Sequence, residues 1–177
     1  MALFLLEDIP GIDAVKASQI ALVHDLAEAE VGDITPFDGI SVQDKHNRER
    51  KAIARASDML RQCTNAQVST KLLQLYDEYE QGQSKEARYV KDIDKIDMLL
   101  QADEYERLHA MDLSTFFEST RGKMKTEFGR RIVAALEKDR NARKSKEMVL
   151  NRTNILTRNV LLLTAAVAMV GVSVWRR

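Results

Sequence analysis

The sequence predicts an all-α protein, because few residues interrupt helices and the composition suits a folded core. Of the 177 residues, only Pro10 and Pro36 are prolines and 7 are glycines, so long helices are allowed from Phe37 onward. Apolar residues make up 45% of the chain and charged residues 31%, values typical of globular proteins. The 27 basic residues balance the 27 acidic residues, so the overall charge gives no reason to expect binding to nucleic acid.

Each expected helix is bounded by a turn or capping residue. The first covers 13–31, where apolar residues recur at helical spacing until Gly32. The second opens at Ser41, whose hydroxyl can cap the amide of Asp44. The expected segments, in chain order, are 13–31, 41–62, 66–81, a long helix that begins near Ser84, and two helical pieces marked by Phe116 and Phe128.

The chain changes in composition after residue 138. We expect a globular domain over 1–138 and a basic helical connector over 139–158, followed by an apolar C-terminal helix over 159–177. The uncharged run ends at Trp175 and is followed by two arginines. This layout predicts a transmembrane tail anchor, although the run only just reaches the ~17 residues needed to cross a bilayer.

The anchor would place the domain on the cytosolic face of a membrane, either the mitochondrial outer membrane or the endoplasmic reticulum. The alternative is a terminal helix that packs on the domain or across a dimer, which would leave the protein cytoplasmic.

Candidate metal ligands cluster in the segment VHDLAEAEVGDITP. Glu28 follows His24 by four residues and Asp25 by three, so the three side chains share one side of a helix. Asp33 follows in a turn closed by Pro36 and can fold back toward that side. One imidazole and three carboxylates suit Mn²⁺, Co²⁺, Zn²⁺ or Mg²⁺. The alternative is a half-buried histidine beside solvated acids.

A second group of acids lies in the segment KDIDKIDMLLQADEYE. Asp94 sits beside the expected buried stripe, where a carboxylate is costly unless a cation or hydrogen-bond donors satisfy it. Asp97 lies one turn later and is a candidate for orienting a ligand. Asp92 and Asp103 are expected to be solvated acids.

These two segments closely resemble the HD-domain metal-dependent phosphohydrolases, and among them the 5′-deoxynucleotidase group. The likeness covers about residues 20–123. It implies an HD-domain helical bundle in which His24, Asp25 and Asp94 bind a divalent metal cation. It further implies that Glu28 acts in catalysis or at a second metal. The substrate pocket or second metal site would be lined by Asp33, Ile34, Thr35 and Pro36.

One family feature is missing from this sequence. The family carries its first metal-binding histidine on an earlier helix, yet no histidine precedes His24. The chain also opens on an apolar run at Met1 without a capping residue. We therefore expect the domain to be incomplete at its N-terminus. The remaining histidines, His46 and His109, are expected to lie on the surface.

The expected function is hydrolysis of deoxyribonucleoside 5′-monophosphates to deoxynucleoside and phosphate, with Glu28 handling the attacking water. Candidates for neutralising phosphate charge are Lys45, Lys91 and Lys95. The alternative is a catalytically impaired, membrane-tethered module that binds nucleotide or acts as a scaffold. A homodimer is a further expectation, by analogy with the family.

Overall fold

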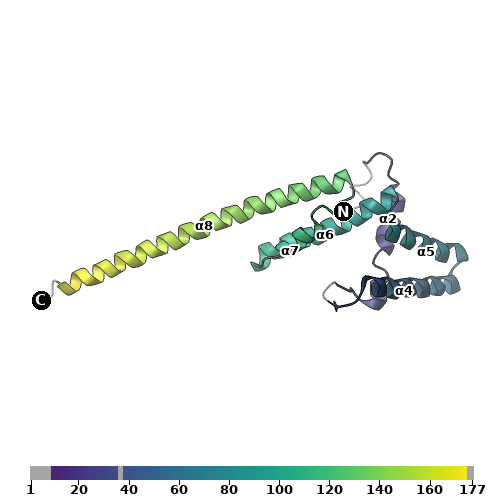
Figure 1. Cartoon of the computed structure of the whole chain (residues 1–177), viewed down its shortest axis with the longest axis horizontal. Helices are drawn as coiled ribbons and strands as arrows, with labels where there is room; N and C mark the ends of the chain where they lie inside the picture. The colour runs from purple at the N-terminus through teal and green to yellow at the C-terminus, as the bar shows by residue number, and fades with distance from the viewer. Residues whose placement is uncertain (1–8, 36–37, 175–177) are drawn as a thin grey trace. The chain divides into compact units, whose positions relative to one another are not determined.

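The computed structural model describes residues 9–35 and 38–174, and it describes side chains as far as Thr153 apart from Asn151. These residues form helices and no strand, which confirms the all-α prediction (Figure 1). The chain divides into two compact units, Met1–Arg131 and Ile132–Arg177. The helices are α2 (Ala14–Val23), α3 (Glu28–Val31), α4 (Val42–Cys63), α5 (Ala66–Gln81), α6 (Lys85–His109), α7 (Ser114–Thr120) and α8 (Glu127–Val174).

Local capping explains where the three long helices of the first unit begin. The hydroxyl of Ser41 accepts a hydrogen bond of 3.1 Å from the amide of Asp44, as predicted. Asn65 caps α5 and Ser84 caps α6 with bonds of the same length. Each cap satisfies a first-turn amide that has no partner inside its own helix. The beginnings of α4, α5 and α6 are therefore set by short-range sequence.

The expected helix over 13–31 is wrong in one respect, because the chain turns between Val23 and Glu28 and forms two helices. On one side of this turn, the fully buried Ile20 packs with α5 and α6. On the other side, Ala27 packs with α4 and α5. The break in the helix therefore coincides with the change from one core cluster to the other.

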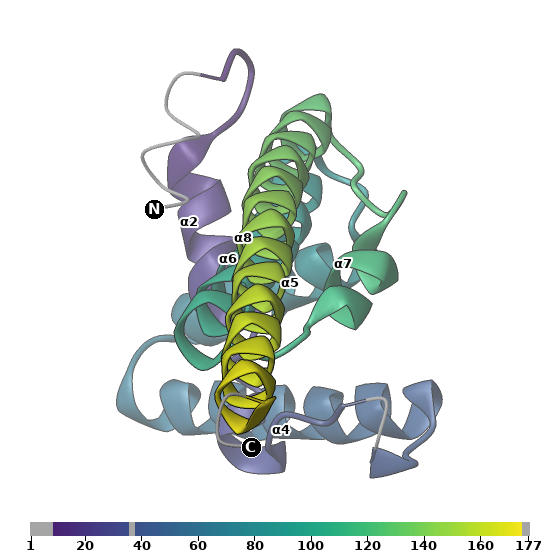
Figure 2. The ribbon, with the colours of Figure 1, turned by 90° about the vertical axis from the view of Figure 1, so that its left-hand side faces the viewer.

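Two apolar clusters make up the core of the first unit. The first joins α2, α5 and α6 and consists of Ala17, Ile20, Leu75, Ala87 and Val90. The second joins the turn before α3 to α4 and α5 and consists of Ala27, Ala52, Ile53 and Tyr76. Figure 2 shows α4 running across the lower part of the same unit, below α2 and α5. Helix α5 contributes to both clusters. In the sequence, the turn at His24 lies between Ile20 of the first cluster and Ala27 of the second.

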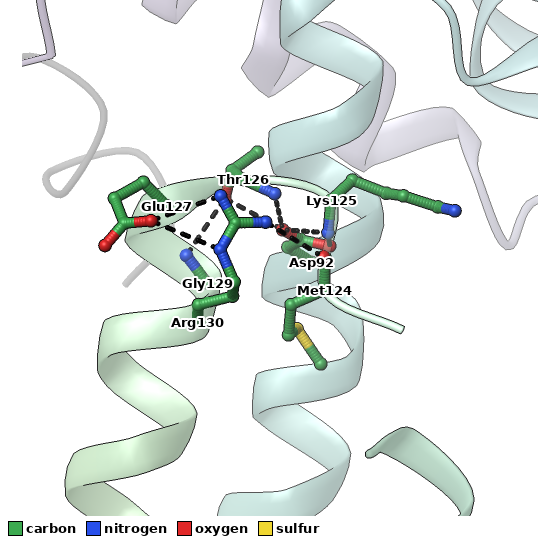
Figure 3. Close-up of polar contacts among 7 residues, drawn as sticks. All are labelled: Asp92, Met124, Lys125, Thr126, Glu127, Gly129 and Arg130. Carbon is green, nitrogen blue, oxygen red and sulfur yellow. Dashed lines mark hydrogen bonds and ion pairs between the residues drawn. The ribbon is translucent and has the colours of Figure 1, made fainter. Parts of the chain in front are cut away.

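Asp92 is fully buried on α6, which contradicts its expected role as a solvated acid. Its carboxylate accepts hydrogen bonds from the amides of Lys125 and Thr126 and from the Thr126 hydroxyl (Figure 3). Gly129 packs against it so closely that an added Cβ would lie 2.5 Å from Oδ2. Asp92 therefore ties the start of α8 to α6, because its carboxylate satisfies amides that a helix end leaves open.

The predicted transmembrane anchor receives no support from the structure. Helix α8 continues to Val174, but the side chains beyond Thr153 and the whole of residues 175–177 lie outside the described residues. Within the part of the chain that is described, no helix is both long and apolar enough to cross a membrane.

Candidate functional site

His24 is the C-cap residue of α2, and both of its ring nitrogens have partners. Nδ1 lies 2.7 Å from the backbone oxygen of Ala21. Because a carbonyl oxygen can only accept, Nδ1 donates this bond and the tautomer is set. Nε2 faces two carboxylates, with Asp25 Oδ2 at 2.9 Å and Asp94 Oδ1 at 3.9 Å. The imidazole is thus held by its own helix and presented to two acids.

Asp94 comes from α6 and reaches His24 although the two residues are far apart in the sequence. This approach depends on the packing of α2 against α6 in the first core cluster. Burial raises the pKa of Asp25, and the nearby charges of Asp94 and Asp33 raise it further, while His24 opposes the shift. A region that gathers several carboxylates in this way favours a cation.

Glu28 begins the short helix α3 and lies close to the same acids. Its pKa is raised first by burial and then by the charges of Asp25 and Asp33. Gly32 follows α3 with φ of 75°, a conformation that residues with a side chain seldom adopt. The chain therefore reverses direction before Asp33, whose side chain is exposed.

A hydrogen bond from a lysine on α4 holds the loop after Asp33. Lys45 Nζ donates a 2.9 Å hydrogen bond to the backbone oxygen of Ile34, which is itself buried. The same ammonium lies 3.5 Å from the buried carboxylate of Glu49. Its positive charge also opposes the raised pKa values of Asp25 and Glu28. Of the predicted phosphate-side lysines, Lys45 is therefore one whose charge acts on two of the site acids.

The remaining predicted loop residues are only partly described. The amide and hydroxyl of Thr35 both donate bonds of 2.7 Å to Asp38 Oδ2, which closes a local turn. Pro36 lies outside the described residues.

Tyr79 on α5 contacts two of the predicted site residues, a role that the sequence did not predict. Its hydroxyl donates to Asp94 Oδ2 at 3.3 Å, and its ring meets the His24 ring edge to face at a centroid separation of 5.2 Å. Burial raises the pKa of the Tyr79 phenol, and the charges of Asp94 and Asp25 add to this. The spacing of apolar residues gave no signal for this contact, since a core tyrosine has the same pattern.

The other candidate lysines and the two remaining histidines have different partners. Lys91 Nζ sits 4.4 Å from the centroid of the Tyr79 ring, and Lys95 donates to the backbone of its own helix. His46 is exposed and lies 3.6 Å from Glu80, while His109 packs against the ring of Tyr105. The expectation that both histidines lie on the surface is confirmed.

The donor set at His24 suits a divalent cation, but the predicted ligand set is not assembled as a cluster. A metal-binding histidine commonly donates its second ring nitrogen to a backbone carbonyl, as His24 does. Imidazole nitrogen and carboxylate oxygen together suit Mn²⁺, Co²⁺ and Zn²⁺. Among the residues that the structure describes, no group of three or more His, Cys, Asp or Glu residues is arranged to hold a metal ion. The ligand set His24, Asp25, Glu28, Asp33 and Asp94 therefore remains a prediction.

Comparison with known proteins decides the family. A family model described as an HD domain matches residues 1–136. The chain belongs to the HD-domain family. Among its relatives is the protein named 5′-deoxynucleotidase HDDC2 from Dictyostelium discoideum, which is 40% identical over 139 residues, covering 76% of this chain and 71% of the relative. The mouse protein of the same name is 40% identical over 129 residues, covering 72% of this chain and 63% of the relative.

A solved HD-domain structure supports the same conclusion. The chain titled HD domain-containing protein YGK1(YGL101W) superimposes with a TM-score of 0.61 at 30% identity, covering 80% of this chain and 73% of that one. The HD-domain resemblance inferred from the two motif segments is therefore confirmed. The chain spans 71% of the length of the Dictyostelium relative and 63% of the length of the mouse relative.

Proposed function

We propose that this HD domain hydrolyses deoxyribonucleoside 5′-monophosphates to a deoxynucleoside and phosphate, with the help of a divalent cation. The observation that carries the proposal is the 40% identity with relatives named 5′-deoxynucleotidase over most of the chain. The His24 site, with its two facing acids, lies within the matched region. The catalytically impaired module is not favoured, because the relatives that match are named as enzymes.

His24, Asp25 and Asp94 would hold the cation. Such an ion supplies Lewis-acid polarisation of the phosphoryl group and a water activated near neutral pH. His24 would contribute its Nε2, because its Nδ1 donates to the backbone oxygen of Ala21. The two carboxylates contribute the negative charge that favours a divalent over a monovalent ion.

Glu28 is the proposed acid–base group. Burial raises the pKa of its carboxyl, and Asp25 and Asp33 raise it further, so its proton affinity is higher than that of a solvated glutamate. A carboxylate of this kind can accept the proton of an attacking water and later release it.

Lys45 and the loop that it fastens would face the nucleotide. The ammonium of Lys45 can offset the phosphate charge while its bond to Ile34 keeps the loop beside α4. Asp33 and the following residues Ile34, Thr35 and Pro36 would then contact the substrate or a second ion.

The test is phosphate release by the full chain from deoxynucleoside 5′-monophosphates, measured with Mn²⁺, Co²⁺, Zn²⁺ and Mg²⁺ in turn and after chelation. We expect release that depends on the added metal and is lost in His24→Ala. The matched control is His46→Ala, because His46 is an exposed histidine on α4 that pairs with Glu80. Release that survives both chelation and His24→Ala, or a preference for a phosphodiester, would contradict the proposal.

A further inference from the structure

Tyr79 connects two residues of the proposed metal site that come from different helices. Its hydroxyl donates to Asp94 Oδ2 on α6 at 3.3 Å. Its ring packs against His24 at the end of α2, with centroids 5.2 Å apart and an interplanar angle of 65°. This edge-to-face geometry is a preferred arrangement for aromatic rings. One side chain on α5 therefore contacts both the imidazole and one of its two facing carboxylates.

The Tyr79 ring is held in place from several directions. The ring packs beside the first core cluster, which joins α2, α5 and α6. From α6, Lys91 Nζ lies 4.4 Å from the ring centroid, a cation–π distance. Helix α5 itself is capped at both ends, by Asn65 and Gly82. A ring fixed in this way can impose an orientation on its neighbours.

The hydroxyl contact gives the two oxygens of Asp94 different partners. Oδ2 accepts from Tyr79, while Oδ1 lies on the side of His24 Nε2, at 3.9 Å. Rotation of the carboxylate would break the bond to the phenol. The contact therefore favours the orientation in which Oδ1 faces the imidazole.

We propose that Tyr79 is a positioning residue, which orients Asp94 and His24 for a divalent cation without touching the substrate. This inference rests on the proposed metal-dependent function. Groups that orient metal ligands in this manner change metal affinity by about 10-fold to 100-fold when they are removed. A purely structural tyrosine would instead affect the stability of the fold and leave metal affinity unchanged.

The test compares wild type with Tyr79→Phe in the full chain. Phenylalanine keeps the ring and its packing on His24 but removes the bond to Asp94. The matched control is Tyr76→Phe, because Tyr76 lies one turn earlier on α5 and packs in the other core cluster. Mn²⁺ affinity is measured by titration calorimetry, and folding is measured by thermal unfolding.

We expect Tyr79→Phe to bind Mn²⁺ about 10-fold more weakly than wild type, with Tm matching that of Tyr76→Phe and with Mn²⁺ affinity unchanged in the control. Wild-type affinity in Tyr79→Phe would overturn the positioning role, and so would a Tm loss beyond that of the control. A wild-type chain that binds no Mn²⁺ would overturn both the role and the metal site. A wild-type chain that binds Mn²⁺ but releases no phosphate would reject the enzymatic function alone, and the affinities would still decide the role of Tyr79.

Discussion

Asp92 Oδ2 on α6 lies 2.7 Å from the backbone nitrogen of Thr126, and it also accepts from the Thr126 hydroxyl at 2.8 Å. These bonds hold the segment that leads into α8 against the middle of α6. Two residues further along α6 is Asp94, which faces His24. The same helix thus anchors the start of α8 and carries a residue of the candidate site.

Replacing Asp92 with alanine should lower the free energy of unfolding by about 3 kcal/mol, because the buried amide of Thr126 and the partly buried amide of Lys125 would lose their acceptor. Chemical denaturation of the full chain measures this loss. Asp97→Ala is the matched control, since Asp97 is an exposed aspartate on the same helix, and its effect should stay within about 0.5 kcal/mol. Equal effects of the two substitutions would show that the buried contacts contribute no stability.

Replacing Glu28 with glutamine should lower kcat by about 10² to 10⁴, the usual contribution of a positioned acid–base group. Mn²⁺ affinity should change much less than kcat. Steady-state phosphate release and calorimetry measure the two quantities separately. The control is Glu30→Gln, because Glu30 lies on α3 but pairs with Arg55 through hydrogen bonds to the guanidinium. Full activity in Glu28→Gln would remove this residue from the mechanism.

Replacing Lys45 with glutamine should lower kcat/KM by about 10-fold to 100-fold, which corresponds to the ~1.5–3 kcal/mol of a hydrogen bond to a charged group. The loss has two sources, because the ammonium both fastens Ile34 and lies near the site acids. Lys45→Arg should recover part of the activity because it keeps the charge. Lys51→Gln, an exposed position on the same helix, should retain wild-type kinetics, and a matching loss there would point to a general effect of α4 charge.

The ion pair between Lys16 on α2 and Glu78 on α5 should make stability depend on pH. Nζ and Oε1 are 2.7 Å apart. Burial raises the pKa of Glu78, but the hydrogen bonds from Lys16 and Ser84 and the positive charge of Lys16 together outweigh this effect, so the net pKa lies below the ordinary 4.5. The hydrogen bond that Lys16 donates to Glu78 raises the pKa of Lys16 above the ordinary 10.5.

The pair therefore stabilises the fold fully between these two ordinary values, and the contribution is lost as the pH falls through the lowered pKa of Glu78. Lys16→Met should cost about 0.5 kcal/mol at pH 7, because the pair is partly exposed, and almost nothing at an acid pH below the lowered pKa of Glu78. Denaturation curves of both proteins at the two pH values measure the difference. A penalty that is constant with pH would assign the effect to packing of the side chain.

The sequence by itself determined the helical class, most helix boundaries and the family. Ser41 and Ser84 lie next to the amides that they cap, so these boundaries depend on interactions within a few residues. The motif segments around His24 and Asp94 were sufficient to indicate an HD domain, which the match over residues 1–136 confirms. These features are local, and a local pattern can be read without knowing how the helices pack.

Only the tertiary structure decided which side chains meet. The break between α2 and α3 separates Ile20 and Ala27, which pack in different clusters. The burial of Asp92 requires the chain around Thr126 to return to α6, and Tyr79 reaches Asp94 only because α5 packs beside α6. Solvated and buried acids have the same sequence spacing on a helix. What distinguishes them is the set of donors brought by distant segments, which compensates the cost of removing a carboxylate from water.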